Sequence, residues 1–310
     1  MKIGTRRSAL ALRQARIVQS ALGERGIDAE LVTFTTTGDK HLGEPLSAIG
    51  AKGLFTIEIE TALAKGKIDC AVHSLKDLPT KSADAVVVAA VLTREDARDV
   101  VVLSRSASAV GLGDLAARSR VGTSSLRRRA QLLALRPDLD VVELRGNVPT
   151  RLRKVEQGQV HAAILAAAGL HRLNATERIA GYLDPPDWLP APGQGAIAVQ
   201  VRADDNQARA AVCVLNDEAT LQAVTAERAF LAALEGGCQV PIGALVVDGI
   251  LHGLIADPDG RRVIRGSHPV TPDDPARAGR VLGKQLLEQG AGDILAAVRA
   301  SDRIPAPQPE

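Results

Sequence analysis

The segment His73-Ser74-Leu75-Lys76-Asp77-Leu78-Pro79 contains residue types that could form a site. It follows the apolar run 68–72, which we predict to be a buried strand. Where that run stops, polar side chains follow closely, and Pro79 then removes a backbone donor and ends regular structure. Open α/β sheets place their ligand groups at such strand ends. A binding or catalytic site and a solvated loop are about equally compatible with this segment alone, and we expect His73 to have a structural or supporting role.

Arginines stand at the start of predicted helices, where the partial positive charge of the helix disfavours each by about 0.3–1 kcal/mol. They are Arg6 and Arg7 before one helix, Arg127, Arg128 and Arg129 in another, and Arg145, Arg151 and Arg153 around Asn147, the predicted N-cap of a third. For a single helix, we would expect such side chains to point to water or to carboxylates elsewhere. Their recurrence favours an anion site, because helix N–H groups and guanidinium forks both bind carboxylate or phosphate. Together with Lys52 and Arg172, they predict a polyanionic ligand in a cleft between domains.

The cysteines divide into different environments. Cys238 follows two glycines in Glu235-Gly236-Gly237-Cys238, where the backbone can approach a ligand closely. An accessible thiol is a candidate nucleophile or attachment point, although a lone cysteine is more often a small core residue. Cys70 and Cys213 both lie in apolar runs, and we expect both to be buried.

Composition excludes several classes of function. The 310 residues carry a net charge of +2, which argues against a general nucleic-acid binder. Aromatic residues make up 2% of the chain, too few for a base-stacking surface. The chain has no phosphate-binding glycine motif of the P-loop or dinucleotide type, no signal peptide pattern and no apolar run of about 18 residues. We expect a cytoplasmic, soluble protein without metal.

Strand and helix patterns alternate along the first two thirds of the chain, which predicts parallel sheets covered on both faces. The first set comprises strand 2–5, helix 8–24, strand 29–35, a polar loop 36–52, helix 54–65, strand 68–73 and strand 86–92. The second comprises strands 99–103, 120–122, 140–144 and 162–167 with helices 125–135 and 148–157, and strand 196–201 follows a proline-rich crossing. The likeness of Gly4-Thr5-Arg6-Arg7-Ser8 to the segment 122–128 indicates that the two sets form similar α/β domains.

The remaining chain predicts a small α+β domain, with helix 218–234, strands near 244–247, 250–256 and 263–267, and helix 275–289. The predicted organisation is domain 1 (1–93 and 196–214), domain 2 (99–190), hinges (94–98 and 190–195), domain 3 (217–300) and a disordered tail (301–310).

Short motifs in a fixed order make the chain resemble the porphobilinogen deaminase family, also called hydroxymethylbilane synthases. They are Thr5-Arg6-Arg7-Ser8, Gly53-Leu54-Phe55, His73-Ser74-Leu75-Lys76-Asp77-Leu78-Pro79, Gly122-Thr123-Ser124-Ser125-Leu126-Arg127-Arg128, Leu144-Arg145-Gly146-Asn147-Val148, Gly193-Gln194-Gly195 and Glu235-Gly236-Gly237-Cys238-Gln239-Val240-Pro241-Ile242-Gly243. The resemblance extends from Lys2 to about Ala297.

The resemblance implies two domains like those of periplasmic binding proteins around a cleft, and a third domain with a cofactor cysteine. The expected enzyme is a transferase of tetrapyrrole and heme biosynthesis. It joins four porphobilinogen molecules head to tail with release of ammonia, and water then releases hydroxymethylbilane. The primer is a dipyrromethane bound through a thioether, which by match of motif would be on Cys238.

The resemblance also assigns roles to individual residues. Asp77 and Lys76 would be catalytic. The cofactor would be held by Cys238, Lys52, Thr123, Ser125, Arg127, Arg128, Arg145, Gly146 and Asp77, and the substrate by Arg6, Ser8, Arg145, Arg151, Arg172 and Gln194. Ile57 stands where many members have lysine, so one contact to a cofactor carboxylate would be made by Lys52 or a neighbour instead. Pro149 stands where many members have glycine or another residue, and it fits a first helical turn.

A protein that captures an organic anion without chemistry is the alternative, because the fold alone does not separate a binder from an enzyme. Cys238 and Asp77 favour the enzyme, since a passive binder needs neither. We expect a monomer.

Overall fold

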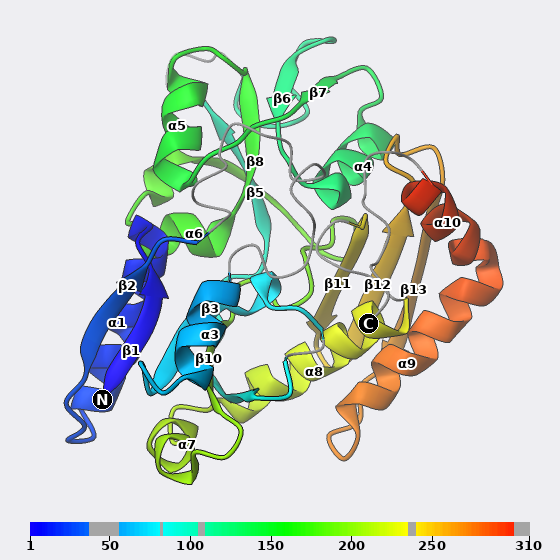
Figure 1. Ribbon diagram of the computed structural model, residues 1–310. Helices are drawn as coiled ribbons and strands as arrows, with labels where there is room; N and C mark the ends of the chain where they lie inside the picture. The colour runs from blue at the N-terminus through cyan, green and yellow to red at the C-terminus, as the bar shows by residue number, and fades with distance from the viewer. Residues whose placement is uncertain (37–55, 81–82, 105–108, 235–239, 301–310) are drawn as a thin grey trace.

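The computed structural model describes residues 1–36, 56–80, 83–104, 109–234 and 240–300. In these ranges the chain forms two five-stranded sheets and one three-stranded sheet, each with its own helices (Figure 1). The predicted class, two α/β domains with a small α+β domain, is therefore confirmed. Lys52, Cys238 and the predicted tail 301–310 lie outside the described residues.

The first sheet has the strand order β2-β1-β3-β10-β4. Its strands are β1 (Lys2–Arg6), β2 (Glu30–Phe34), β3 (Cys70–Ser74), β4 (Val86–Val91) and β10 (Ile197–Arg202). Its helices are α1 (Ala9–Gly23), α3 (Ile57–Ala64) and α7 (Asn206–Cys213). Helical spacing aligns Ala15, Val18 and Leu22 on one side of α1, and this face packs on Ile3 and Val72 of the sheet.

The second sheet has the order β7-β6-β8-β5-β9. Its strands are β5 (Asp99–Leu103), β6 (Arg120–Gly122), β7 (Asp140–Val142), β8 (Ala162–Ala166) and β9 (Ile179–Leu183). Its helices are α4 (Leu126–Leu135), α5 (Val148–Glu156), α6 (Ala167–Arg172) and the 3-10 turn η3 (Thr176–Arg178). Alternate residues of β5 belong to opposite cores, Val101 to one and Val100 and Val102 to the other, so both faces of this sheet are covered.

The two five-stranded sheets have equivalent strand orders, which confirms the prediction of similar domains. Strand β10 pairs with β3 and β4, so the chain returns to the first sheet after visiting the second. The prediction of purely parallel sheets is wrong, because β10 is antiparallel to both of its neighbours and β5 is antiparallel to β8 and β9. These two strands follow the crossings between sheets directly, so each enters its sheet from the opposite end without a crossover helix. The domain boundaries themselves stay predictions.

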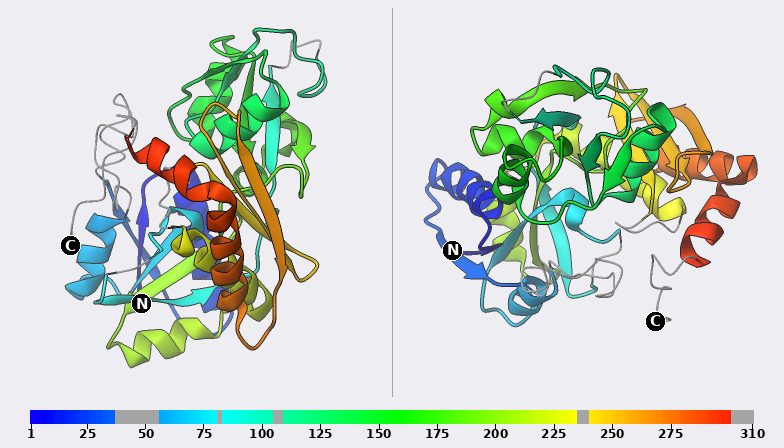
Figure 2. Two further views of the ribbon diagram at one scale, coloured as in Figure 1. Left: turned by 90° about the vertical axis from the view of Figure 1, so that its right-hand side faces the viewer. Right: turned by 90° about the horizontal axis from the view of Figure 1, so that it is seen from above.

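The third unit has an antiparallel sheet of β11 (Ile242–Val247), β12 (Ile250–Ala256) and β13 (Val263–Pro269). Its helices are α8 (Glu218–Ala233), α9 (Pro275–Leu286), the π-helical turn η4 (Leu287–Ala291) and α10 (Gly292–Ala300). Phe230 of α8 is fully buried in this core. A Cβ at Gly279 of α9 would meet the α8 backbone, so glycine permits the close approach of these helices. Figure 2 shows α9 and α10 along the outer side of the sheet.

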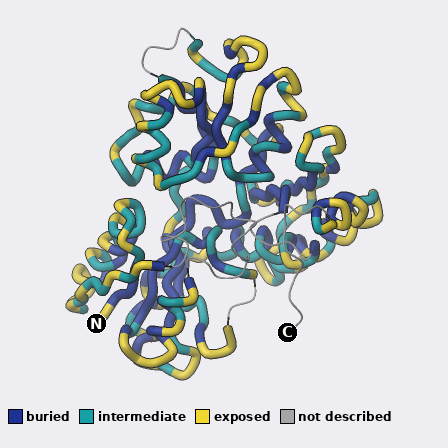
Figure 3. The backbone as a smooth tube through the Cα atoms, turned by 45° about the horizontal axis from the view of Figure 1, so that its top comes forward, coloured by how far each residue is buried: buried dark blue, intermediate teal, exposed yellow. Residues whose placement is uncertain are grey.

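The crossings between the two large sheets are tied to the third unit. Glu227 of α8 is fully buried and forms a bidentate ion pair with Arg94, with N–O distances of 2.6 and 3.0 Å. The same carboxylate accepts from the backbone N–H of Gly193 at 2.8 Å. Gly195 has φ of +90°, and a Cβ there would meet the Glu95 carbonyl, so this position requires glycine. The crossings are therefore packed and hydrogen-bonded. Residues 192–195 are buried and residues 94–98 are mostly half-buried, and Figure 3 shows buried chain through the middle of the molecule.

Several elements were not predicted, namely α6, η3, β9, α7, η4 and α10. Cys70 is buried as expected, but the expectation for Cys213 is wrong, because it ends α7 with an exposed side chain. Within the described ranges, the helices lack the length and apolar character needed to cross a bilayer.

Candidate active site

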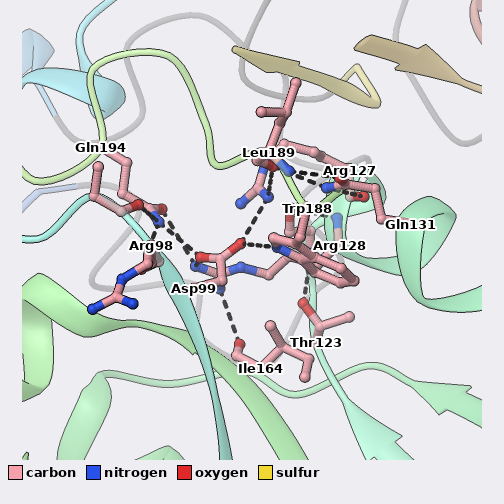
Figure 4. A network of polar contacts seen from close by, with 12 residues as sticks. Arg98, Asp99, Thr123, Arg127, Arg128, Gln131, Ile164, Trp188, Leu189 and Gln194 are labelled. Carbon is pink, nitrogen blue, oxygen red and sulfur yellow. Dashed lines mark hydrogen bonds and ion pairs between the residues drawn. The ribbon is translucent and has the colours of Figure 1, made fainter. Parts of the chain in front are cut away.

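A buried carboxylate, Asp99 at the start of β5, organises the polar side chains between the two large sheets (Figure 4). Its donors are Arg127 Nη1 at 2.7 Å, Arg128 Nη2 at 2.7 Å, Gln194 Nε2 at 2.7 Å and Trp188 Nε1 at 2.9 Å. Burial by itself raises the pKa of Asp99, but the charges of Arg127 and Arg128 outweigh burial and bring this pKa well below its ordinary value. Asp99 therefore stays ionised and fixes both guanidinium groups.

Arg127 lies behind the pocket wall. Its Nη1 also donates to the Leu189 carbonyl at 2.7 Å, and the residue is 4% exposed. Burial lowers its pKa, and Asp99 opposes this effect. The geometry gives Arg127 a supporting role, while its predicted contact with a cofactor carboxylate stays a prediction.

Arg128, in contrast, lines a pocket between the two sheets. Its Nη1 donates to the Ile164 carbonyl at 3.0 Å, and its Nη2 donates to the Asp99 carboxylate at 2.7 Å. Its Nε is buried and has no hydrogen-bond partner among the described residues. A buried donor left unmatched is costly, so this atom indicates where an acceptor from a ligand would bind.

The pocket is strongly cationic. Its polar wall is formed by Gln14, Ser74, Lys76, Arg128, Arg151, Arg172 and Gln194. Burial, followed by the charge of Arg128, lowers the pKa of Lys76 to about 8. Burial, followed by the charges of Arg128 and Arg145, lowers the pKa of Arg151 to about 10. These side chains repel one another and would gain free energy from a bound polyanion.

Lys76, Arg151 and Arg172 each contact a neutral oxygen, whereas Arg128 is paired with Asp99. Lys76 Nζ lies 3.1 Å from Gln194 Oε1, Arg151 Nε lies 2.7 Å from the Gly146 carbonyl, and Arg172 Nη2 lies 2.6 Å from the Gly195 carbonyl. A neutral acceptor orients a cation without removing its charge, so these contacts are compatible with binding of an anionic ligand.

Asp77 follows Lys76, a residue of the pocket lining, in sequence. It ends the 3-10 turn η2 (Leu75–Asp77), which follows β3 directly. Its negative charge acts on both Lys76 and Arg151, raising the pKa of each against the stronger effect of burial. Of the predicted catalytic pair, Lys76 lines the pocket together with Arg151 of α5, and Asp77 is close enough for its charge to act on both.

The predicted hydroxyl ligands serve as helix caps. Ser8 Oγ accepts from Ala11 N at 3.3 Å at the start of α1, and Ser125 Oγ accepts from Arg128 N at 3.4 Å at the start of α4. Thr123 Oγ1 accepts from Ser125 N at 3.2 Å. These caps set the direction in which each helix starts and hence where its arginines point.

Gly146 and Arg145 support Arg151. Gly146 has φ of +116°, and a Cβ there would meet Thr150 at 2.7 Å, so glycine allows its carbonyl to face Arg151. Arg145 lies near enough to lower the pKa of Arg151 and is 4.0 Å from Glu143. Pro149 lies in the first turn of α5, as predicted.

Other predicted cations lie away from the pocket. Arg129 donates to the Val141 carbonyl at 2.8 Å, and Arg7 and Arg153 are exposed. Arg6 is half-buried and close enough to His73 to lower its pKa. Ile57 is 53% exposed at the start of α3.

Sequence reasoning missed Asp99 and gave Gln194 an incomplete role. Gln194 is 1% exposed, and its amide links Lys76 of the first domain to Asp99 and Arg128 of the second. The available signal for Asp99 was an acidic residue opening the apolar run Val100-Val101-Val102, because a carboxylate beside buried residues needs partners.

The fold and site define a protein with two α/β units, a smaller third unit and a cationic pocket between the two large sheets, as expected for a protein that handles an organic polyanion. The family model "Porphobilinogen deaminase, dipyromethane cofactor binding domain" matches residues 1–210, and the model of the C-terminal domain of that family matches residues 221–288. The chain belongs to the porphobilinogen deaminase family. This confirms the predicted family, its transferase class and its dipyrromethane cofactor, and favours an enzyme over a passive binder.

Relatives named porphobilinogen deaminase extend over nearly the whole chain. The one from Syntrophobacter fumaroxidans is 48% identical, covering 95% of this chain and 96% of its own. The one from Moorella thermoacetica is 49% identical and covers 97% of each chain. The methionine binding protein MetQ aligns with a TM-score of 0.43 and 16% identity over 76% of this chain and 94% of its own, a level at which structural similarity alone supports no conclusion.

We expect Asp99→Asn to destabilise the fold. The amide keeps the shape of the side chain but leaves Arg127 and Arg128 buried without an anion, which costs about 3–5 kcal/mol. Urea denaturation at pH 7 measures the change in the free energy of unfolding. Asp84→Asn, at an exposed position, is the control and should change it by less than about 0.5 kcal/mol. Equal stability of the two variants would contradict the role of Asp99.

We expect His73 to make stability depend on pH. Burial, followed by the charge of Arg6, lowers the pKa of His73 from 6.5 to about 4, so the folded protein holds it neutral. Between these values the unfolded chain binds a proton that the folded chain does not. Stability therefore falls with decreasing pH, by roughly 1.4 kcal/mol per unit within the window.

Urea denaturation at pH 7, 6 and 5 tests this expectation. His73→Gln should flatten the dependence, while His268→Gln in β13 should retain it. A wild-type slope retained by His73→Gln would show that other groups cause it.

Proposed function

We propose that the pocket beside Asp77 is where this chain joins porphobilinogen units into hydroxymethylbilane. The observation that carries the proposal is the cluster of Lys76, Arg128, Arg151 and Arg172 around one pocket, with Asp77 as the carboxylate acting on it. Porphobilinogen carries two carboxylates per ring, so the negative charge grows as rings are added. A protein of net charge +2 can bind such a chain only where its cations are concentrated.

The residues of the pocket fit the dipyrromethane cofactor. Carboxylates of the cofactor would match the unpartnered Nε of Arg128 and the carbonyl-held cations Lys76 and Arg151. When bound, the dipyrromethane supplies the pyrrole ring to which the first substrate unit is joined. We propose Cys238 as its attachment point, on the strength of its Gly-Gly-Cys sequence; this residue, like Lys52, lies outside the described part of the chain.

We assign Asp77 to the reacting end of the substrate. Loss of ammonia breaks the bond between the aminomethyl carbon and its nitrogen, the electron pair leaves with nitrogen, and the pyrrole is left with positive charge. A carboxylate beside the ring stabilises that charge and can accept the proton released when rings are joined. Lys76, whose pKa is about 8 because it is buried, can exchange a proton near neutral pH or bind a substrate carboxylate.

The remaining assignments follow the same electrostatic logic. Arg172 and Arg151 would bind substrate carboxylates, since bidentate guanidinium groups match carboxylate geometry. Gln194 lines the same pocket. Arg6, Ser8, Thr123, Ser125, Arg145 and Gly146 stay predicted contacts or supports. We also propose that the protein acts as a monomer in the cytoplasm. Domain 1 and domain 2 would move relative to each other about the crossings.

We expect the purified protein to be heavier than its sequence by one dipyrromethane, because the thioether survives purification. Intact-protein mass spectrometry measures the increment, and Ehrlich's reagent should colour the protein. Cys238→Ser should lose both signals. Cys213→Ser, at an exposed thiol of α7, should keep both. An increment that remains on Cys238→Ser would place the attachment elsewhere.

We expect Asp77→Asn to fold normally and to lose turnover. Removal of the carboxylate abolishes charge stabilisation and proton transfer, which are together worth about 10²- to 10⁴-fold. Formation of hydroxymethylbilane by the holoenzyme measures kcat and KM, and a melting curve confirms folding. The exposed Asp84→Asn should match the wild type. Normal turnover by Asp77→Asn would rule out the assignment.

A further inference from the structure

The chain that leaves Asp77 has few hydrogen bonds of its own. After η2, residues Leu78, Pro79 and Thr80 belong to no helix or strand. Among the backbone hydrogen bonds of the described residues, none uses the carbonyls of these three residues. Backbone hydrogen bonds from the described residues to these carbonyls therefore do not fix the exit of the turn that carries Asp77.

Arg228 of α8 supplies the missing donors. Its Nη1 donates to the Leu78 carbonyl at 3.2 Å, and its Nη2 donates to the carbonyls of Pro79 at 2.5 Å and Thr80 at 3.4 Å. A guanidinium group is planar and has several fixed N–H directions, so it can bind successive carbonyls at once. Arg228 and Leu78 are 150 residues apart in sequence, and this contact exists only in the folded protein.

The helix that carries Arg228 also packs under the turn. Val224 of α8 is buried in one cluster with Leu75 and Leu78, the apolar residues on either side of Lys76 and Asp77, and Leu221 packs against the same cluster. The apolar residues of the turn are therefore buried against α8, while Lys76 between them lines the pocket.

The helix is itself fixed with respect to the crossings. Glu227, next to Arg228, is fully buried. Its carboxylate accepts hydrogen bonds from Arg94 and from the Gly193 N–H. A Cβ at Gly193 would lie 3.1 Å from Leu75 Cγ, so the crossing and the turn are in close contact. A residue on α8 can therefore hold the turn at a set distance from the pocket.

We propose that Arg228 is a positioning residue for Asp77: by binding the carbonyls of residues 78–80, it fixes the turn and hence the direction of the Asp77 carboxylate. The proposal rests on the proposed function of Asp77. A carboxylate displaced by about 1 Å loses as much as about 10²-fold in rate, because catalysis depends on the orientation of the reacting groups. The third domain thus contributes to catalysis through a contact with the first, apart from any cofactor attachment.

The test compares kcat and KM of the wild type and variants, each as the holoenzyme with its cofactor content verified by intact-protein mass. Arg228→Ala should lower kcat by about 10- to 100-fold with little change in KM, because positioning and not binding is lost. Arg228→Lys should have a kcat between those of the wild type and Arg228→Ala, since one ammonium group can bind only some of the carbonyls of residues 78–80. The control Arg209→Ala removes an exposed arginine of α7 and should leave kcat unchanged.

A double-mutant cycle separates positioning from general stability. In an Asp77→Glu background, where the carboxylate is already misplaced, Arg228→Ala should reduce kcat much less than in the wild type. Equal fold-losses in both backgrounds, an effect on KM alone, or no effect would each overturn the proposal. If Arg228→Ala does not fold, Arg228→Lys in both backgrounds provides the same comparison.

Failure of the proposed function gives a different result. In that case wild-type protein makes no bilane or Asp77→Glu is fully active. If the wild type is active and depends on Asp77, but Arg228→Ala lowers kcat by the same factor in both backgrounds, only the positioning role of Arg228 is refuted.

Discussion

The contact of Asp99 with Arg127 and Arg128 is the interaction on which the site depends, since it places a carboxylate and two guanidinium groups together away from water. Isolated charges in such surroundings would cost several kcal/mol each, so each partner requires the others. Trp188 and Gln194 complete the shell with neutral donors. The result is a rigid polar centre from which Arg128 extends to the pocket while Asp99 is kept away from any ligand.

This centre also connects the domains. Gln194 lies in the crossing between the sheets, and its two amide atoms contact Asp99 on one side and Lys76 on the other. The other crossing is anchored by Arg94 on Glu227 of α8. Both crossings are therefore held by buried polar groups from a neighbouring unit. Of the pocket cations, Arg128 is fixed by a carboxylate, while Arg151 and Arg172 contact backbone carbonyl oxygens that leave their charge in place. Such cations suit an enzyme whose ligand gains negative charge during the reaction.

Much of the fold follows from local patterns. The periodicity of α1, α4 and α5 and the apolar runs of β3, β4 and β5 place these elements within a few residues of their observed bounds. Arginines at helix starts predicted a polyanion site, because a cluster of like charges is unfavourable without a ligand, and two of them, Arg128 and Arg151, line one pocket. Short elements such as α6 and α7 were missed, since they carry too few turns for a clear period. The antiparallel direction of β5 and β10 was missed because strand direction depends on how the chain crosses between domains.

By itself, the sequence determined the classes of residue available to the site, the caps that start its helices and the family to which the chain belongs. The tertiary structure decided which cations face the pocket and which are buried supports, separating Arg128 and Arg151 from Arg127 and Arg129. It also decided that Asp99 pairs with arginines of a helix remote in sequence and that Arg228 of the third unit contacts Leu78 of the first. The physical reason is that burial and ion pairing depend on distances between segments remote in sequence, and no local pattern encodes those distances.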